Sequence, residues 1–252
     1  MQNIKEALAE TAQKHQVRIL YACETGSRAW GFPSPDSDFD VRFIYVHERD
    51  WYLSLSQRKD SIEFMSGDLD ITGWDLRKCL LLLKKSNAPL IERFNSPVVY
   101  QAEAGFRESF MERIRDFYSP TAVFFHHLSL ARKFRDELEG RQEIKLKNWF
   151  YMVRSLLSCV WISRESAVVP MSILELMEVV DPAKKTGLLD LIQLKSQVDE
   201  KYLHRRTDEM DAWMRNWFIM AEAAEGKLPV NRADIHSLNT YFLNMLNVYA
   251  HL

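Results

Sequence analysis

Hydrophobic and polar positions along the chain change their spacing near residue 103. Before this point, short apolar runs alternate with turn residues, which is the pattern of strands and helices joined by loops. From Ala104 onward, nearly every segment repeats its apolar positions with the period of a helix. The pattern predicts an α/β (α+β) domain with a mixed sheet over residues 1–103, followed by a mostly α-helical domain over residues 104–252.

The first domain is expected to contain four strands, the last two joined as a hairpin at Ser66 and Gly67. Asp75 is a suitable N-cap for the helix that follows, and Pro89 a suitable first residue for the next helix. In the second domain, helices are expected to break at proline and glycine. The predicted strands are 17–23, 40–46, 60–65 and 68–74, and the predicted helices are 2–15, 75–86, 89–94, 104–117, 120–139, 144–165, 171–179, 183–200, 208–225 and 231–248.

Composition limits the classes of function. Of the 252 residues, 47% are hydrophobic and 27% charged, as in an ordinary globular protein. The net charge of −2 excludes a global basic field for coating nucleic acid but allows a local basic groove. Cys23, Cys79 and Cys159 form no CxxC pair, which argues against a disulfide framework or a zinc cluster and favours a reducing, cytoplasmic setting. The charged N-terminus and the lack of a run of ~18 apolar residues predict neither a leader peptide nor a membrane span.

Candidate chemistry concentrates in the stretch GSRAWGFPSPDSDFDVRFIYV, which starts at Gly26. A residue without a Cβ suits a sharp turn beside a ligand, and the Ser27 hydroxyl with adjacent backbone amides could hold a phosphate. Arg28 and Arg42 could neutralise phosphate, although an arginine at the surface is the commoner case. Arg42 has the better geometry because it shares a strand face with Asp38 and Asp40.

Asp38 and Asp40 alternate with apolar residues on an incipient strand, so both carboxylates are expected on one face. Paired carboxylates favour a hard cation such as Mg²⁺ over zinc. A third carboxylate is expected on a later strand, where Asp70 in LDI is preferred and Glu63 in IEF stays open. Three carboxylates could hold two ions about 4 Å apart, with Mn²⁺ as the alternative metal. The competing interpretation is that the aspartates cap turns.

A polar stripe marks one helix of the second domain. Lys147, Tyr151 and Arg154 fall at i, i+4 and i+7 on a helix whose other positions are largely apolar. The stripe predicts contacts to a phosphate or to an acceptor. The alternatives are an ordinary solvated face, or pairing of Tyr151 and Arg154 with acidic neighbours.

These motifs carry a family resemblance. Gly26-Ser27, then Asp38-Phe39-Asp40, then Asp70 between apolar residues resemble the nucleotidyltransferase superfamily that includes DNA polymerase beta. The long stretch from Gly26, together with YLSL, NAPLIERFNSPVVY and KNWFYMVRSLL, is similar to the RNA repair pathway DNA polymerase beta family. The resemblance covers residues 20 to about 180. Trp30 departs from the common pattern, in which a smaller or basic residue often stands at that position.

The resemblance implies transfer of a nucleoside monophosphate from a nucleoside triphosphate to an acceptor hydroxyl, with Mg²⁺ and release of pyrophosphate. Gly26 and Ser27 would contact the triphosphate, while Asp38, Asp40 and Asp70 would hold metal. Asp70 would also orient or deprotonate the acceptor. The family name implies an RNA end as the acceptor.

Two other functions fit the same residues: nucleotidyl transfer to a protein or small molecule, and a non-catalytic regulatory or protein-binding module on the same fold. Three intact carboxylates favour an enzyme, because their mutual repulsion is costly without a cation. The near-neutral net charge argues mildly against an extended RNA surface, whereas a short RNA end would need few contacts.

Overall fold

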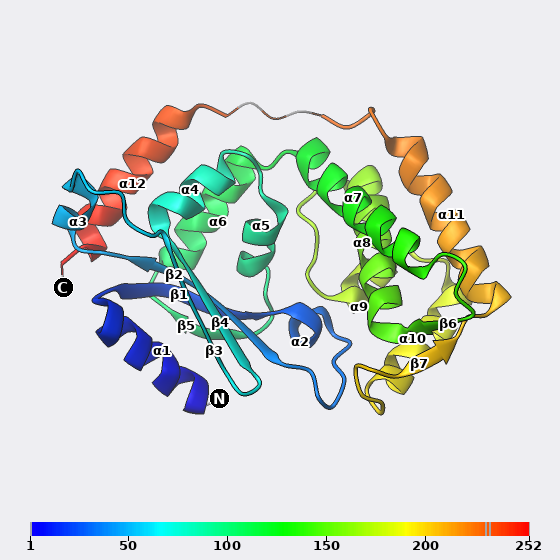
Figure 1. Cartoon of the computed structure of the whole chain (residues 1–252). Coiled ribbons are helices and arrows are strands. Elements are labelled where there is room, and N and C mark those ends of the chain that lie inside the picture. The colour runs from blue at the N-terminus through cyan, green and yellow to red at the C-terminus, as the bar shows by residue number, and fades with distance from the viewer. Residues whose placement is uncertain (1, 230, 232, 252) are drawn as a thin grey trace. The chain divides into compact units, whose positions relative to one another are not determined.

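A five-stranded sheet organises the first part of the computed structural model, which describes residues 2–229, 231 and 233–251 (Figure 1). The chain divides into two compact units. The first unit comprises Met1–Gly26, Asp38–Tyr118 and Arg232–Leu252, and the second comprises Ser27–Ser37 and Ser119–Asn231. The predicted domain boundary at residue 103 stays a prediction.

The elements of the first unit combine strands with short helices. They are α1 (Gln2–His15), β1 (Arg18–Thr25), β2 (Phe39–Val46), α3 (Arg49–Leu53), β3 (Ser61–Ser66), β4 (Leu69–Asp75), α4 (Leu76–Leu83), α5 (Ala88–Phe94), β5 (Val99–Ala102), α6 (Phe106–Phe117) and α12 (Ile235–Tyr249). The predicted strands and helices of this region are all present, whereas the five-residue α3 and the four-residue β5 were not predicted.

The sheet is mixed, and its strand order is β3-β4-β2-β1-β5. Strands β2 and β4 pair in parallel, while the other neighbouring pairs are antiparallel. In the parallel pair, Asp40 lies opposite Asp70 and Arg42 lies opposite Thr72. The expected fold class, an α+β fold with a mixed sheet and many helices, is confirmed.

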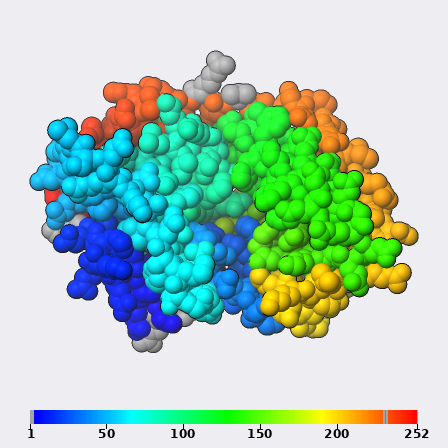
Figure 2. Space-filling model, in the orientation of Figure 1, coloured from blue at the N-terminus to red at the C-terminus, as the bar shows by residue number. Residues whose placement is uncertain are grey.

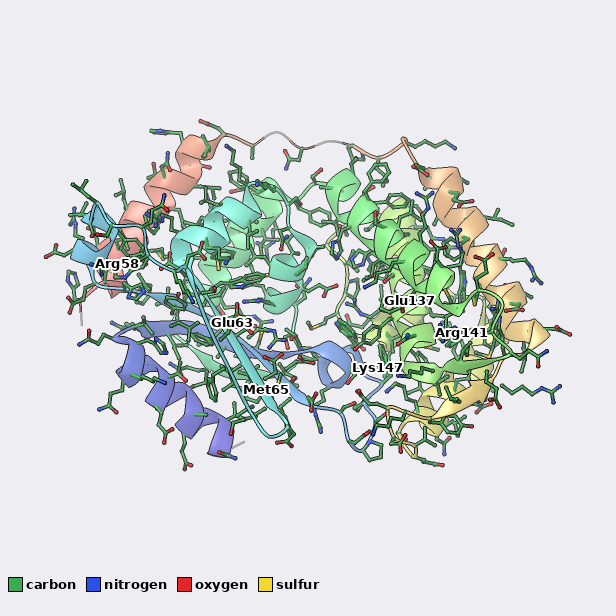
Figure 3. The ribbon with its side chains drawn as sticks, viewed as in Figure 1. Arg58, Glu63, Met65, Glu137, Arg141 and Lys147 are labelled. Atoms are coloured by element: carbon green, nitrogen blue, oxygen red, sulfur yellow. The ribbon has the colours of Figure 1, made fainter. Side chains whose placement is uncertain are left out.

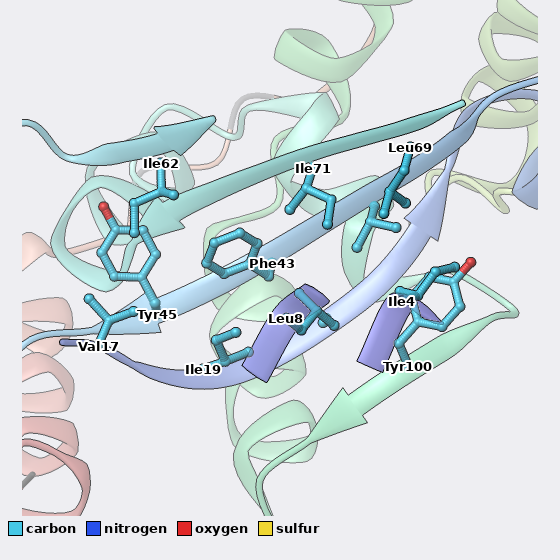
Figure 4. Packing of buried hydrophobic residues seen from close by; sticks show 12 residues of the cluster. Ile4, Leu8, Val17, Ile19, Phe43, Tyr45, Ile62, Leu69, Ile71 and Tyr100 are labelled. Atoms are coloured by element: carbon cyan, nitrogen blue, oxygen red, sulfur yellow. The ribbon is translucent and has the colours of Figure 1, made fainter. Parts of the chain in front are cut away.

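Helix α1 covers one face of the sheet. Its Ile4 and Leu8 pack with Phe43 of β2 and Ile71 of β4 (Figure 4). Val41 of β2 belongs to the same cluster. Burying each large side chain of this kind contributes about 1.5–3 kcal/mol. Because strand side chains alternate, the residues between these buried positions, such as Asp40 and Asp70, point to the opposite face of the sheet.

Helices α4 and α5 contact the strands from that opposite face, where Tyr21 of β1 stacks on Phe94 of α5 at 5.0 Å between ring centroids. Both helices begin with a side-chain cap. Asp75 accepts the N–H of Arg77 at 2.8 Å, as the sequence predicts for this N-cap, and Asn87 accepts the N–H of Leu90 at 3.1 Å. These caps satisfy N–H groups that a helix start leaves without partners.

The β3–β4 hairpin forms an edge of the sheet, and its segment lies at the surface in cyan (Figure 2). Glu63 and Met65 project from β3 and are exposed (Figure 3). The hairpin is present, but its turn lies one residue later than predicted, at Gly67 and Asp68, because Ser66 ends β3 and pairs with Leu69. Gly67 has φ +60°.

The second unit is mostly helical. Its elements are the greater part of α2 (Gly26–Trp30), followed by α7 (Pro120–Leu138), β6 (Glu143–Lys145), α8 (Leu146–Glu165), α9 (Ile173–Leu176), the 3₁₀ helix η1 (Met177–Val179), α10 (Pro182–Lys195), β7 (Leu203–Arg205) and α11 (Asp208–Ala224). Helix α8 packs against α7 and α11. The sequence pattern missed α2 and the short antiparallel pair of β6 and β7.

Most predicted helices lie within a few residues of the observed ones, but α10 ends at Lys195 rather than at residue 200. Residue 232, inside the predicted helix 231–248, and residues 1, 230 and 252 lie outside the described residues. Among the helices that are described, none is both long enough and apolar enough to cross a membrane.

Candidate active site

An acidic pair is centred on one arginine in the first unit. Asp40 and Asp70 are register partners on parallel strands, so their side chains share a face of the sheet. Nη2 of Arg42 donates to Oδ1 of Asp40 at 2.9 Å and to Oδ2 of Asp70 at 2.8 Å. Its Nη1 donates to the carbonyl oxygen of Asp70 at 3.0 Å. One guanidinium therefore holds both carboxylates close together.

Gly26 leaves room for this acidic pair. Its backbone lies in the left-handed region, with φ +63°, which favours glycine. A Cβ at this position would lie 2.0 Å from Oδ2 of Asp40, well inside van der Waals contact. The glycine therefore serves both the turn after β1 and the close approach of the Asp40 carboxylate.

A buried carboxylate supports Asp40 from the backbone side. Glu24 is 1% exposed, and its Oε1 accepts the N–H of Asp40 at 2.7 Å. Its Oε2 accepts the hydroxyl of Tyr100. Burial raises the pKa of Glu24, while the hydrogen bonds from Tyr100 and Asp40 act in the opposite direction. Sequence reasoning missed Glu24, although an acid at the end of the apolar strand RILYACET is a usable signal.

The other predicted carboxylates are placed differently. Asp38 is exposed and lies just before β2, and Glu63 is exposed on edge strand β3 opposite Thr72. Asp70, rather than Glu63, shares Arg42 with Asp40. Across residues 2–229, 231 and 233–251, no three His, Cys, Asp or Glu side chains form a group that could hold a metal ion.

Ser27 and Arg28 belong to the second unit, where both contact Ser37. The Ser27 hydroxyl donates to Oγ of Ser37 at 3.1 Å, and Arg28 donates to the Ser37 carbonyl through Nε at 3.1 Å and Nη2 at 2.7 Å. Oγ of Ser37 donates in turn to Oε1 of Glu200 at 3.0 Å. These bonds fold the segment 27–37 into a hydrogen-bonded loop.

The polar stripe of α8 lies against the same loop. Nζ of Lys147 donates to Oε2 of Glu200 at 2.5 Å. The ring of Tyr151 meets Trp30 edge to face at 5.1 Å, and the guanidinium of Arg154 lies 4.6 Å from the centre of the Trp30 ring. Arg154 is 3% exposed and donates to the carbonyl of Met171 at 3.1 Å. Arg154 is therefore buried against Trp30, and the stripe is not an ordinary solvated face.

The acidic pair has the chemistry of a site for a hard divalent cation. Both donors are carboxylate oxygens, which Mg²⁺ prefers, and Mg²⁺ is commonly bound through one or two carboxylates plus substrate phosphates. The guanidinium of Arg42 forms an ion pair with each carboxylate, and its positive charge reduces the repulsion between Asp40 and Asp70. The space beside Oδ2 of Asp40 is open only because Gly26 has no Cβ. These residues fit a metal that a bound nucleotide would help to coordinate.

Comparison with known proteins places this geometry in a family context. The sequence model of the RNA repair pathway DNA polymerase beta family matches residues 1–244. The uncharacterized protein YcgL of Bacillus subtilis (strain 168) is 39% identical over 248 residues, which span 96% of this chain and 95% of that protein.

Among solved structures, a nucleotidyltransferase-like protein from Exiguobacterium sibiricum 255-15 aligns with 88% of this chain and 73% of its own. The identity is 13% and the TM-score is 0.32.

Proposed function

Because the chain belongs to the RNA repair pathway DNA polymerase beta family, we propose that it is a Mg²⁺-dependent nucleotidyltransferase that transfers a nucleoside monophosphate from a nucleoside triphosphate to the hydroxyl of an RNA end. Family and fold indicate a polymerase-beta-type nucleotidyltransferase, and such a family implies a nucleoside triphosphate substrate. The observation that carries the proposal is the pair of Asp40 and Asp70, aligned on parallel strands and joined through Arg42.

In this proposal, Asp40 and Asp70 hold the metal, and Asp38 joins them from the residue before β2. Bound Mg²⁺ supplies charge neutralisation of the phosphates and lowers the pKa of the attacking hydroxyl. Asp70 orients or deprotonates the acceptor hydroxyl, which attacks the α-phosphorus of the nucleotide while pyrophosphate leaves. Glu24 holds the backbone N–H of Asp40, so that the start of β2 keeps its position while the carboxylate binds.

Residues of the second unit are assigned to the nucleotide. Ser27 and Arg28 follow directly after Gly26 at the start of α2, and serine hydroxyls and arginine forks are common phosphate ligands. Lys147, Tyr151 and Arg154 are assigned to the same substrate. Trp30 packs between Tyr151 and Arg154, which orients these two side chains.

The identity of the acceptor as an RNA end is the most specific part of the proposal. The support for an RNA acceptor is the description of the family. The net charge of −2 does not add to this support, because an extended RNA surface would need an excess of basic residues. A short RNA end needs only a few cationic contacts. Transfer to a protein or to a small molecule is therefore a separate outcome of the acceptor screen described below.

A non-catalytic module is the second candidate function, and one observation favours it. Arg42 pairs with both Asp40 and Asp70 and balances one of their two negative charges, so the acidic pair can serve as an internal salt bridge. On this alternative, the carboxylates stabilise the sheet and the chain acts by binding a partner.

The deciding experiment measures nucleotide binding and transfer in matched variants. Each ribonucleoside triphosphate is titrated calorimetrically with and without Mg²⁺. The nucleotides that bind are then tested with three kinds of acceptor: RNA oligonucleotides that end in different groups, proteins, and small molecules that carry a hydroxyl. Asp40→Asn and Asp70→Asn should each lower the rate of transfer at least about 1,000-fold, the scale of losing a key electrostatic group. Asp68→Asn, on an exposed residue of the β3–β4 turn, is the control and should retain the rate.

Each outcome separates the candidates. Mg²⁺-dependent transfer that is lost in Asp40→Asn and Asp70→Asn supports the enzyme. Nucleotide binding that is equal with and without Mg²⁺ and unaffected by both substitutions contradicts the metal assignment and favours the non-catalytic module. Transfer to a protein or small molecule, but not to RNA, keeps the enzyme and replaces the acceptor.

A further inference from the structure

Arg93 is a buried arginine without an acidic neighbour. It lies in α5 and is 4% exposed. Its Nη1 is buried and has no hydrogen-bond partner among the described residues. Burial lowers the pKa of Arg93 to about 10, and the other groups that influence it are Cys79, Cys23 and Arg42, none of which is a carboxylate. The molecule therefore keeps a positive charge inside without an anion to balance it.

One aromatic contact offsets part of the cost of this charge. The guanidinium of Arg93 lies 3.3 Å from the centre of the Trp74 ring. A desolvated cation–π contact of this kind is stabilising. Burying an ion costs more free energy than this contact returns, and an apolar residue of similar volume often gives equal or greater stability. Stability alone thus gives no reason for an arginine at this position.

Arg93 lies on the face of the sheet that carries the acidic pair. Asp70, Thr72 and Trp74 alternate along β4 with buried residues of the opposite face, so all three share the face that Arg42 also occupies. Trp74 is four residues beyond Asp70, which corresponds to about 13 Å along a strand. Arg42 is engaged by Asp40 and Asp70, whereas Arg93 has no carboxylate among its electrostatic neighbours.

We propose that Arg93 binds the polyphosphate chain of the nucleotide substrate. This inference deepens the proposed function and rests on it. Phosphate oxygens match the planar fork of a guanidinium and would supply the anion that the buried charge lacks. The polyphosphate would extend from the acidic pair along β4 toward Trp74. Binding would move Arg93 relative to the Trp74 ring, which offers an optical signal.

The test uses inorganic tripolyphosphate without divalent cations, so that the readout does not depend on Asp40 and Asp70 holding metal. The melting temperature and tryptophan fluorescence of the full chain are followed as the anion is added. Arg93→Met replaces the guanidinium by an apolar side chain. Arg77→Met is the matched control, because Arg77 also lies over aromatic rings of this unit but is exposed.

The expected result has two parts. Without the anion, Arg93→Met should melt at the same temperature as the wild type or higher. With it, the variant should lose the rise in melting temperature and bind tripolyphosphate at least tenfold more weakly, while Arg77→Met behaves like the wild type. Arg93→Lys, which keeps the charge but loses the fork, should bind with intermediate affinity and replaces Arg93→Met if that variant does not fold.

Three results would overturn the assignment. The first is a wild type that does not respond to tripolyphosphate or pyrophosphate. The second is an Arg93→Met variant that melts lower but keeps the full response to the anion, which would mean a structural role. The third is dependence on Arg93 for binding of a short RNA but not of polyphosphate. If only the proposed function is wrong, the result differs from all three: tripolyphosphate still binds in a way that depends on Arg93, but no nucleotidyl transfer is detected.

Discussion

Gly26 and Asp40 approach each other more closely than any residue with a side chain at position 26 would permit. A Cβ on Gly26 would lie 2.0 Å from Oδ2 and 2.9 Å from Cγ of Asp40. The glycine also has φ +63°, where side chains are strained. A glycine is therefore required at position 26 for two reasons: the left-handed backbone conformation and the close approach of the Asp40 carboxylate.

Gly26→Ala should lower the free energy of unfolding more than Gly67→Ala does. Both glycines have φ near +60°, but a Cβ at Gly67 meets nothing within 4 Å. Gly67→Ala should cost about 1–2 kcal/mol from backbone strain alone, and Gly26→Ala about 1–3 kcal/mol more from overlap with Asp40. Urea unfolding of both variants gives the comparison. Equal losses would mean that Asp40 moves aside without cost.

Arg42→Gln should make the stability of the chain depend on divalent cations. Without the guanidinium, the carboxylates of Asp40 and Asp70 face each other, and their repulsion should cost about 1 kcal/mol because both are partly solvated. Mg²⁺ should raise the melting temperature of Arg42→Gln more than that of the wild type. Adding Asp70→Asn to this variant removes the repulsion and should abolish the extra effect of Mg²⁺.

A melting temperature of Arg42→Gln that does not change between Mg²⁺ and EDTA would contradict the prediction. The carboxylates would then be separated by side-chain movement rather than bridged by a metal. The double variant identifies this case, because Asp70→Asn would add nothing to the stability of Arg42→Gln.

Glu200→Ala should loosen the loop of residues 27–37. The Glu200 carboxylate accepts hydrogen bonds from Ser37 and Lys147, and its backbone N–H donates to Asp36 at 2.9 Å. Removal of the carboxylate should speed amide hydrogen exchange in the loop at least about tenfold, because local opening no longer breaks the carboxylate's bonds to Ser37 and Lys147. Asp199→Ala, at the adjacent exposed residue, is the control. Unchanged exchange in the loop would show that the Glu200 carboxylate does not hold it and that other bonds, such as that from Lys195 to Ser34 at 2.8 Å, suffice.

Asp75→Asn should change the pH dependence of stability. Burial raises the pKa of Asp75 to about 6, although the Tyr52 hydroxyl and the Arg77 N–H bond to its carboxylate. Between pH ~4 and pH ~6 the folded chain therefore binds more protons at this site than the unfolded chain, so this group's contribution to stability falls as pH rises. Asparagine removes that loss and remains a good N-cap.

The stability of Asp75→Asn relative to the wild type should thus increase from pH 4 to pH 7, by at most roughly 3 kcal/mol. Urea midpoints of both proteins at the two pH values measure it, and effects of all other groups cancel in the difference. A relative stability that is the same at both pH values would show that Asp75 is ionised in the folded chain throughout.

The acidic pair illustrates what local pattern can predict. Alternation along DFDVRF places Asp40 and Arg42 on one face and Phe39 and Val41 on the other, because strand side chains alternate. The partner on the neighbouring strand is not encoded locally. Asp70 lies opposite Asp40 only through a register between strands distant in sequence, and no periodicity distinguishes it from Glu63 before that register is known.

Contacts between distant segments explain most of what the sequence could not predict. Ser37 and Glu200 are 163 positions apart, and Lys195 and Ser34 are 161 apart. Helical period predicts Arg154 on a polar stripe, but it does not reveal that Trp30 covers the guanidinium. Strands β6 and β7 have three residues each, too few for an alternating pattern to be recognised. The metal and nucleotide roles of the site residues stay predictions.

The parallel pairing of β2 with β4 also determines when the acidic pair can exist during folding. Parallel strands cannot be joined by a tight turn, and Arg42 and Asp70 are 28 positions apart. The segment with α3 and β3 must fold back before β4 can pair with β2, and such non-local pairing is slow because the loop must close first. A nascent chain that has not yet added β4 to the sheet carries Asp40 without its partner, so the site matures only after this part of the fold is complete.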